Sequence, residues 1–138
     1  MTQNKPPVKK QISSLSILLV DDYKPARVLL RSYMARLGVG RVEEATDSIE
    51  ALRLVMETTV NRTPFDAVFV SLGIREMNGL EFVRSIRQLS ALSTLPLILI
   101  SENSEAATTR EALTTGINEF LLRPYEEETL KRILTKLT

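Results

Sequence analysis

The amino-acid sequence predicts an α/β fold in which five parallel strands form a doubly wound sheet with five helices on its two faces. Two observations predict this fold. Short apolar runs alternate with amphipathic stretches along almost the whole chain, which is typical of a repeated strand–helix unit. Most of these runs are apolar at nearly every position, as strands buried on both faces of a parallel sheet must be. Right-handed crossovers between parallel strands then place helices on both faces.

Five strands are expected where the short runs fall. Four of them are almost continuously apolar, namely 17–20, 67–70, 95–100 and 120–122. The remaining run, 42–45, reads Val-Glu-Glu-Ala, and its charges suit a strand at the edge of the sheet.

The segments between the strands show the three-and-four spacing of amphipathic helices. The first should end at Gly38 and bury a stripe made of Ala26, Leu29, Leu30, Tyr33 and Leu37. Asp47 is expected to cap the second, with Glu50 three residues further on. The last should bury Leu130, Ile133, Leu134 and Leu137. The fourth, about 104–115, is rich in threonine, a poor helix former, and we expect it to be the least stable helix and part of a partner interface.

Composition sets limits on the class of protein. The chain of 138 residues fits one domain, and we expect a flexible leader over 1–14 and a single folded domain over 15–138. With no cysteine and no histidine, disulfides, zinc–thiolate sites and histidine chemistry are excluded. A formal net charge of +1 gives no general attraction to nucleic acid or to an anionic membrane. No apolar run has membrane-spanning length, so a cytoplasmic protein that binds neither nucleic acid nor membrane is expected.

Polar residues follow the predicted strands at the edge where the carboxyl ends of parallel strands meet. These residues are Asp21 and Asp22 after the first strand, Ser71 after the third, Ser101 after the fourth and Arg123 after the fifth. Ligands of open parallel sheets bind at this edge. Carboxylate oxygens suit Mg²⁺, while hydroxyl and guanidinium groups donate to phosphate oxygens. The pattern therefore indicates a site for a divalent cation and a phosphoryl-like anion.

Five segments in order resemble bacterial response-regulator receiver domains of the CheY-like kind. They are the acidic start 18–22 (Leu-Leu-Val-Asp-Asp), the second strand-to-helix join 44–51, the third strand and its loop 66–81, the fourth strand with its hydroxyl residue 95–101, and the closing segment 116–125 that contains Arg-Pro-Tyr. The resemblance covers nearly everything from 16 to 137. It implies a flavodoxin-like strand order, a non-enzymatic role in two-component phosphorelay signalling, and the site roles described next.

The position of the family's phosphoacceptor aspartate is occupied by Ser71, five residues after Asp66. A carboxylate attacks a phosphohistidine directly, whereas a serine hydroxyl needs a base and would give a stable ester. Asp21, Asp22 and the Gly73 backbone correspond to the family's metal ligands. With Arg123 in place of lysine and no third carboxylate, Mg²⁺ binding should be weak or lost, because Arg123 can pair bidentately with either aspartate.

Further departures lie beside the pocket, where Ile74, Arg75, Asn78 and Glu102 replace the family's usual residues. Ser101 and Phe120 occupy the positions of the switch hydroxyl and the switch aromatic residue. A serine that caps a helix and a phenylalanine in the core are the ordinary alternatives.

The closing segment gives two more expectations. Tyr125 should be exposed on the face of the fourth helix, fifth strand and fifth helix, which is the family's docking surface. The resemblance also implies a cis Arg123–Pro124 bond.

The favoured hypothesis is a pseudo-receiver, a protein-interaction module independent of aspartyl phosphorylation. Its partners would be a histidine kinase, a signalling target or another receiver, with a homodimer through the fourth-helix to fifth-helix face as a further expectation. The main alternative is a receiver that still binds Mg²⁺ and accepts a phosphoryl group at an unconventional oxygen. A small-ligand or flavin-binding module is disfavoured, because the first loop, 22–25, is acidic and contains no glycine.

Overall fold

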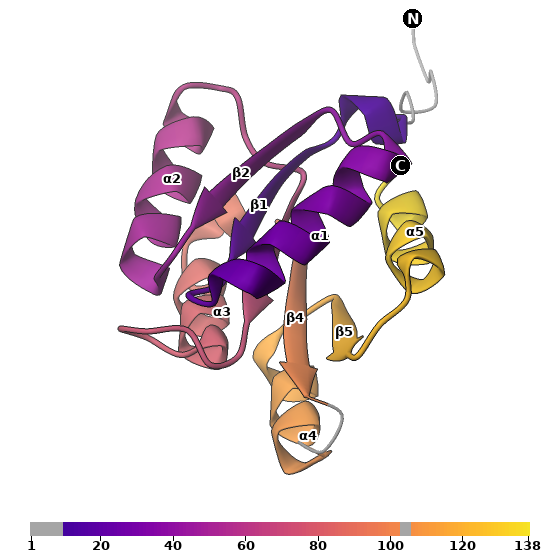
Figure 1. Ribbon diagram of the computed structural model, residues 1–138. Helices are drawn as coiled ribbons and strands as arrows, with labels where there is room; N and C mark the ends of the chain where they lie inside the picture. Colours follow the sequence, from indigo (N-terminus) through magenta and orange to yellow (C-terminus); the bar gives the residue numbers. More distant parts are fainter. Residues whose placement is uncertain (1–9, 103–105) are drawn as a thin grey trace, which may run out of the picture.

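A computed structural model describes residues 10–102 and 106–138, except for the side chains of 106–109. Five strands form one parallel sheet in the order β2-β1-β3-β4-β5 (Figure 1). The strands are β1 (Ser16–Val20), β2 (Arg41–Ala45), β3 (Ala67–Ser71), β4 (Leu97–Glu102) and β5 (Glu119–Arg123). This confirms the predicted sheet and places β2 at an edge.

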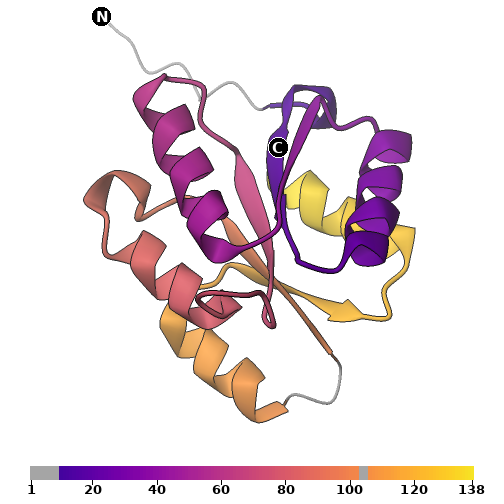
Figure 2. The same ribbon diagram turned by 60° about the vertical axis from the view of Figure 1, so that its left-hand side comes forward.

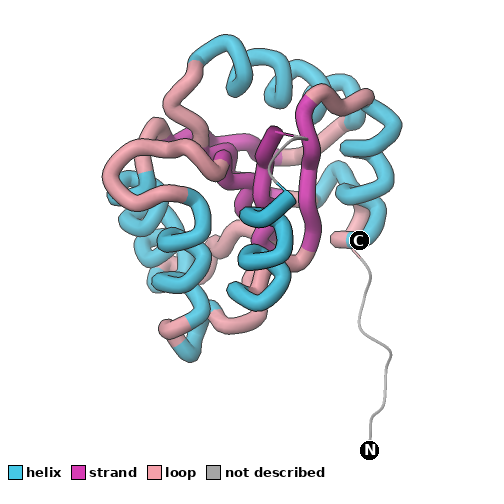
Figure 3. Tube along the Cα trace, turned by 90° about the horizontal axis from the view of Figure 1, so that it is seen from below, coloured by secondary structure: helices cyan, strands magenta, loops and turns pink. Residues whose placement is uncertain are grey.

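The helices cover both faces of the sheet. They are α1 (Lys24–Leu37), α2 (Ser48–Val60), α3 (Gly79–Arg87), α4 (Ala106–Thr115) and α5 (Glu127–Lys136). Helices α1 and α5 lie on one face, and α2, α3 and α4 lie on the other (Figure 2). Seen from below in Figure 3, the strands form a layer between the two groups of helices.

Each face of the sheet has its own apolar core. One core joins α2 and α3 to alternate strand residues such as Leu18, Val70 and Leu99. The other joins α1 and α5 to the intervening residues, such as Leu19 and Phe69. Because side chains alternate across a strand, strands buried on both faces must be apolar at successive positions, which explains the continuous runs in the sequence.

Regular structure begins before residue 15, the predicted start of the folded domain. Residues Ile12–Ser14 form a 3₁₀ helix, and Ile12 packs against the α1–α5 core. Lys10 Nζ lies 2.6 Å from Asp66 Oδ1. Residues 10–14 of the predicted leader are thus in contact with the domain through an apolar side chain and an ion pair. Residues 1–9 of that leader, and the predicted start of the fourth helix at 104–105, lie outside the described residues.

The predicted helix signals are largely confirmed. Gly38 ends α1 in the left-handed conformation at φ 85°. Asp47 accepts a hydrogen bond from the Glu50 amide, and Glu50 Oε1 accepts one from the Thr46 amide, which together form a capping box at α2. The buried stripe of α1 is partly wrong, since Leu30 and Met34 are buried whereas Leu29 is exposed. Helical spacing places Met34 four residues after Leu30, so the face toward the sheet is turned relative to the predicted one.

The loop between β3 and α3 is tied to the start of α2 by Ser48. The buried Ser48 hydroxyl donates to the Arg75 carbonyl oxygen at 3.1 Å and accepts from the Met77 amide at 2.7 Å. Asp47 and Arg75 also form an isolated parallel bridge. These bonds fix the path of the loop that follows Ser71.

Arg87 joins the end of α3 to the start of β5. Its guanidinium donates to the carbonyl oxygens of Gly116 (2.9 Å), Leu92 (3.3 Å) and Ser93 (3.1 Å), and to Asn118 Oδ1 (2.9 Å). All four acceptors are neutral, and burial lowers the pKa of Arg87. Hydrogen bonds thus hold this cation where no carboxylate among the described residues pairs with it.

Among the described residues, no helix combines the length and apolar character that crossing a bilayer requires.

Candidate functional site

The predicted site residues do meet at the carboxyl edge of the sheet. Ser71 is the last residue of β3, and Asp21 and Asp22 directly follow β1, the strand beside it. Ser101 lies on β4, next to β3, and Glu102 on β4 is paired in register with Arg123 on β5. Parallel pairing of four strands therefore gathers residues that are about a hundred positions apart in sequence.

The Asp21 carboxylate is buried and hydrogen-bonded within the site. It is only 4% exposed, and Arg123 Nη2 donates to its Oδ2 at 2.5 Å. The Tyr23 amide donates to Oδ1 at 3.0 Å. Both carboxylate oxygens thus have donors from the chain itself. Arg123 pairs with an aspartate as predicted, but through one nitrogen and not bidentately.

Asp22 has a looser partner from the β3–α3 loop. Arg75 Nε lies 3.7 Å from Asp22 Oδ2, and both side chains are partly exposed to solvent. The sequence showed Arg75 as a departure from the family but did not reveal this pairing. The Arg75–Asp22 pair depends on the path of the β3–α3 loop, which Ser48 fixes. The spacing of residues in the sequence does not predict that path.

The four charged groups compensate one another. Two carboxylates face two guanidinium groups, so their formal charges cancel, and Arg123 Nη1 also lies 3.8 Å from Glu102 Oε1. Among the described residues no group of three or more acidic side chains could hold a metal ion. Ser71 adds a neutral oxygen, and Gly73, two residues further on, adds only its backbone. This arrangement fits a divalent cation poorly, because Mg²⁺ prefers anionic oxygens that are free to coordinate it.

The two serines are buried at the ends of adjacent strands. Ser71 is 6% exposed and Ser101 is 3% exposed. In the described part of the chain, Ser101 Oγ has no hydrogen-bond partner. Residues 103–105, which lead into the helix that Ser101 could cap, lie outside the described residues. Buried hydroxyl groups without partners are rare and mark places where a ligand, a water molecule or a movement satisfies them.

The predicted switch residue Phe120 and the predicted interface residue Tyr125 pack against opposite faces of the sheet. Phe120 is partly buried and packs against the core beneath α2, α3 and α4, which agrees with its core alternative. The Tyr125 ring does not lie on the α4–β5–α5 surface, where the sequence predicted it. It turns toward α1 and packs edge-on against Tyr33, with ring centroids 5.9 Å apart. The Arg123–Pro124 bond that precedes it is cis, as predicted.

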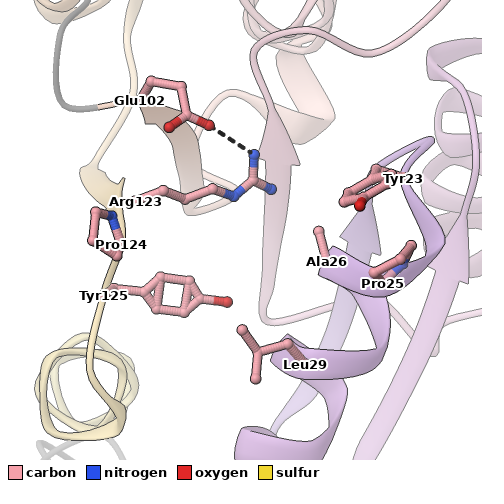
Figure 4. Close-up of a pocket in the computed structure, with 8 residues that line it drawn as sticks. All are labelled: Tyr23, Pro25, Ala26, Leu29, Glu102, Arg123, Pro124 and Tyr125. Atoms are coloured by element: carbon pink, nitrogen blue, oxygen red, sulfur yellow. Dashed lines mark ion pairs between the residues drawn. The ribbon is translucent and has the colours of Figure 1, made fainter.

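A cavity of about 470 Å³ opens between α1 and the β5–α5 connection. Its walls are mainly apolar and carry one charged pair at the end, with Tyr23, Pro25, Ala26, Leu29, Glu102, Arg123, Pro124 and Tyr125 around it (Figure 4). The close-up shows the Tyr125 ring directed across the cavity toward Leu29. The cavity adjoins the acidic pocket, because Arg123 contributes to both.

The position of Tyr125 predicts an alkaline titration. Burial raises the pKa of its phenol from 10.0 to about 12. Since this folded-state pKa lies above the unfolded one, the stability from burying the neutral phenol is complete below pH about 10 and is lost as the pH rises toward 12. We expect ultraviolet absorbance to show one of the three tyrosines ionising late. Tyr125→Phe should remove that late step, and its persistence in the variant would contradict the assignment.

Comparison with known proteins identifies the family. The sequence pattern of the response regulator receiver domain matches residues 17–135, and the chain belongs to this family. The fold is that of a receiver domain of two-component signalling.

Two relatives illustrate the range of proteins that contain such a domain. Chemotaxis protein CheY-3 of Vibrio cholerae is 27% identical over 124 residues, which cover 90% of this chain and 92% of that protein. Sensor protein EvgS of Escherichia coli is 32% identical over 123 residues, which cover 89% of this chain but 10% of EvgS. Similar domains thus occur alone and within long sensor proteins.

Solved structures agree with the fold. CheY4 of Vibrio cholerae has a TM-score of 0.79 and 25% identity, covering 91% of this chain and 99% of that one. The receiver domain of sensor histidine kinase PA1611 from Pseudomonas aeruginosa has a TM-score of 0.78 and 26% identity, covering 90% and 97%. That structure contains a magnesium ion coordinated in the active-site cleft, so a magnesium site is consistent with the family.

Proposed function

We propose that this receiver is a pseudo-receiver, which acts as a protein-interaction module in two-component signalling without aspartyl phosphorylation. The observation that carries the proposal is the pairing of both aspartates with arginines of the chain, beside Ser71, which the resemblance places at the acceptor position. We also propose that it works in the cytoplasm without enzymatic activity and binds proteins in preference to nucleic acid.

The chemistry of Ser71 supports this function. A serine hydroxyl must lose a proton to attack phosphorus, and the family's reaction uses a nucleophile that is already anionic. Asp21, which follows the neighbouring strand, is a candidate base, but its carboxylate oxygens accept hydrogen bonds from Tyr23 and Arg123. A phosphoserine formed here would be a stable ester and not a labile acyl phosphate. A signal that must be switched off quickly is poorly served by such an ester.

The arginines also oppose metal binding. Mg²⁺ would have to displace Arg123 from a bond of 2.5 Å and bring its own positive charge beside two guanidinium groups. Its expected affinity is therefore weak. Without metal and phosphate, Ser101 and Phe120 receive no signal from the pocket, and the docking surfaces keep one arrangement.

Partners follow from the relatives. EvgS and PA1611 are sensor proteins with receiver domains, and the CheY proteins act in chemotaxis. We infer that this chain binds a histidine kinase, a signalling target or another receiver, through contacts that do not depend on its phosphorylation.

A titration with Mg²⁺ and then beryllofluoride tests the proposal. Backbone amide shifts would be followed at Asp22, Ser71, Ser101 and Phe120. We expect no saturable shift at millimolar Mg²⁺ and none with beryllofluoride. Saturable shifts that reach Ser101 and Phe120 would show a working switch and overturn the proposal.

A variant with the family's residues restored serves as the positive control. Ser71→Asp combined with Arg75→Pro and Arg123→Lys returns the third carboxylate and removes both competing guanidinium groups. We expect this variant to show Mg²⁺-dependent shifts under identical conditions. If it responds and the native chain does not, the cause lies in these positions and not in the assay.

A second candidate function is a receiver that binds Mg²⁺ and accepts a phosphoryl group at an unconventional oxygen. The unpartnered, buried Ser101 Oγ favours it, because a bound phosphate oxygen would accept that hydrogen bond. Treatment with an acyl phosphate, followed by intact mass spectrometry, separates the candidates. An added phosphoryl mass that resists hydroxylamine would identify a serine ester and favour this second function.

A further inference from the structure

Helix α2 carries an exposed apolar stripe on the side away from the sheet. Ile49 is 57% exposed, Met56 is 50% exposed and Val60 is 80% exposed. Arg53 lies between them, also exposed. At 100° per residue these four positions fall within an arc of about 60°, so they form one continuous stripe. None of the four belongs to the pocket at the sheet edge.

The spacing of the stripe is symmetric. Its intervals are four, three and four residues, so it reads the same from either end about a midpoint between Leu54 and Val55. A two-fold interface requires a surface that is complementary to its own rotated copy. We propose that this face of α2 binds the same face of a second copy of the chain, with the two helices antiparallel.

In the antiparallel arrangement, apolar parts of one helix face apolar parts of the other. Ile49 meets Val60 of the second copy at each end of the stripe, and Met56 lies over the aliphatic stem of Arg53 of the second copy. Charge is complementary as well. Arg53 and Glu57 form an ion pair at 2.9 Å within one helix, and Arg53 of one copy comes to lie one residue from Glu57 of the other. The same pair can therefore be made between copies, and no buried charge loses its partner.

This face is a better candidate for self-association than the one the sequence suggested. Tyr125 does not contribute to the α4–β5–α5 surface, because its ring packs against Tyr33. In the described part of the chain, the exposed large apolar residues of that surface are Leu113 and Leu122. They lie on different elements, whereas the α2 residues form one stripe. A single helix pair buries less than the roughly 1,200 Å² of stable complexes, so association should be weak. A dissociation constant of about 0.1–1 mM is expected.

Sedimentation and transverse NMR relaxation over a concentration series, up to roughly millimolar protein, would measure the association. Val60→Glu is expected to weaken dimerisation at least about tenfold, because it buries an unpaired charge against the apolar Ile49 of the second copy. Leu122→Glu on β5 is the matched control and should leave it unchanged. A native chain that stays monomeric over the whole series would overturn the proposal. The reverse pattern, in which Leu122→Glu abolishes the dimer and Val60→Glu does not, would move the interface to α4–β5–α5.

A charge-swap experiment tests the register. Arg53→Glu alone should weaken the dimer, and adding Glu57→Arg should restore most of the loss, because the pair is then rebuilt across the interface. Absence of rescue, with both variants folded by circular dichroism, would reject the antiparallel register. The magnesium and beryllofluoride titration is independent of these results, so the failure of one proposal does not decide the other.

Discussion

Replacing Arg123 with methionine should lower the free energy of unfolding by about 3 kcal/mol, because it leaves the buried carboxylate of Asp21 without its cation. Asp21 is almost fully buried, and its carboxylate accepts a hydrogen bond from the Arg123 cation, whereas Arg27 Nη1 donates to its backbone oxygen at 2.7 Å. Methionine keeps much of the side-chain volume, so the loss reports on the charge. Urea denaturation at neutral pH with a chelator present gives the measurement.

Two variants serve as controls for this result. Arg36→Met breaks the exposed ion pair with Glu127 and should cost less than about 1 kcal/mol. The double variant Asp21→Asn, Arg123→Met removes both charges and should be more stable than Arg123→Met alone. Equal losses for Arg123→Met and Arg36→Met would show that the Asp21–Arg123 pair contributes little.

Adding Mg²⁺ to Arg123→Met extends the experiment to function. The freed carboxylate of Asp21, next to Asp22, can then coordinate the ion, and a ligand that binds only the folded state raises its stability. We expect millimolar Mg²⁺ to recover part of the lost stability in the variant and to leave the native chain unchanged. Equal responses of the two chains would mean that Arg123 does not compete with metal.

Replacing Arg87 with alanine should cost about 2–4 kcal/mol, since hydrogen bonds from a charged group are worth more than neutral ones. The carbonyl oxygens of Gly116, Leu92 and Ser93 and the Asn118 amide oxygen would all lose a donor. Thermal or urea unfolding measures the loss. Hydrogen exchange should increase most near Gly116 and Asn118, where the contacts are lost.

The neighbouring Arg84 provides the matched control on the same helix. It forms an exposed ion pair with Glu111, and Arg84→Ala should change stability by less than about 1 kcal/mol. Arg87→Lys tests the geometry, because an ammonium group cannot reach four separate acceptors as the guanidinium fork does. Full stability in Arg87→Lys would contradict the assigned hydrogen-bond network.

The fold was predictable because its signals are local. Continuous apolar runs, helix period, the Asp47 cap and Gly38 each act within a few residues. The buried face of α1 was less predictable. Leu29 and Leu30 are adjacent and equally apolar, and only contact with the sheet decides which is buried.

The site was predictable where strand order alone determines it. Asp21, Ser71, Ser101 and Arg123 follow strands that must lie together in a parallel sheet. The Arg75–Asp22 pair and the Tyr125 orientation were not predictable in this way. The first depends on a loop held by Ser48, and the second on a ring contact with Tyr33, and both join segments distant in sequence.

The Ser48 hydroxyl has a consequence for long-range coupling. It holds the loop that carries Arg75, and it belongs to the first turn of α2, whose outer stripe is the proposed dimer face. A ligand that pushes this loop away from the pocket therefore also acts on the end of that helix. By thermodynamic linkage, a change in pocket affinity on dimerisation requires an equal change in dimer affinity on ligand binding. The buried Ser48 hydroxyl would thus make ligand binding in the pocket depend on protein concentration.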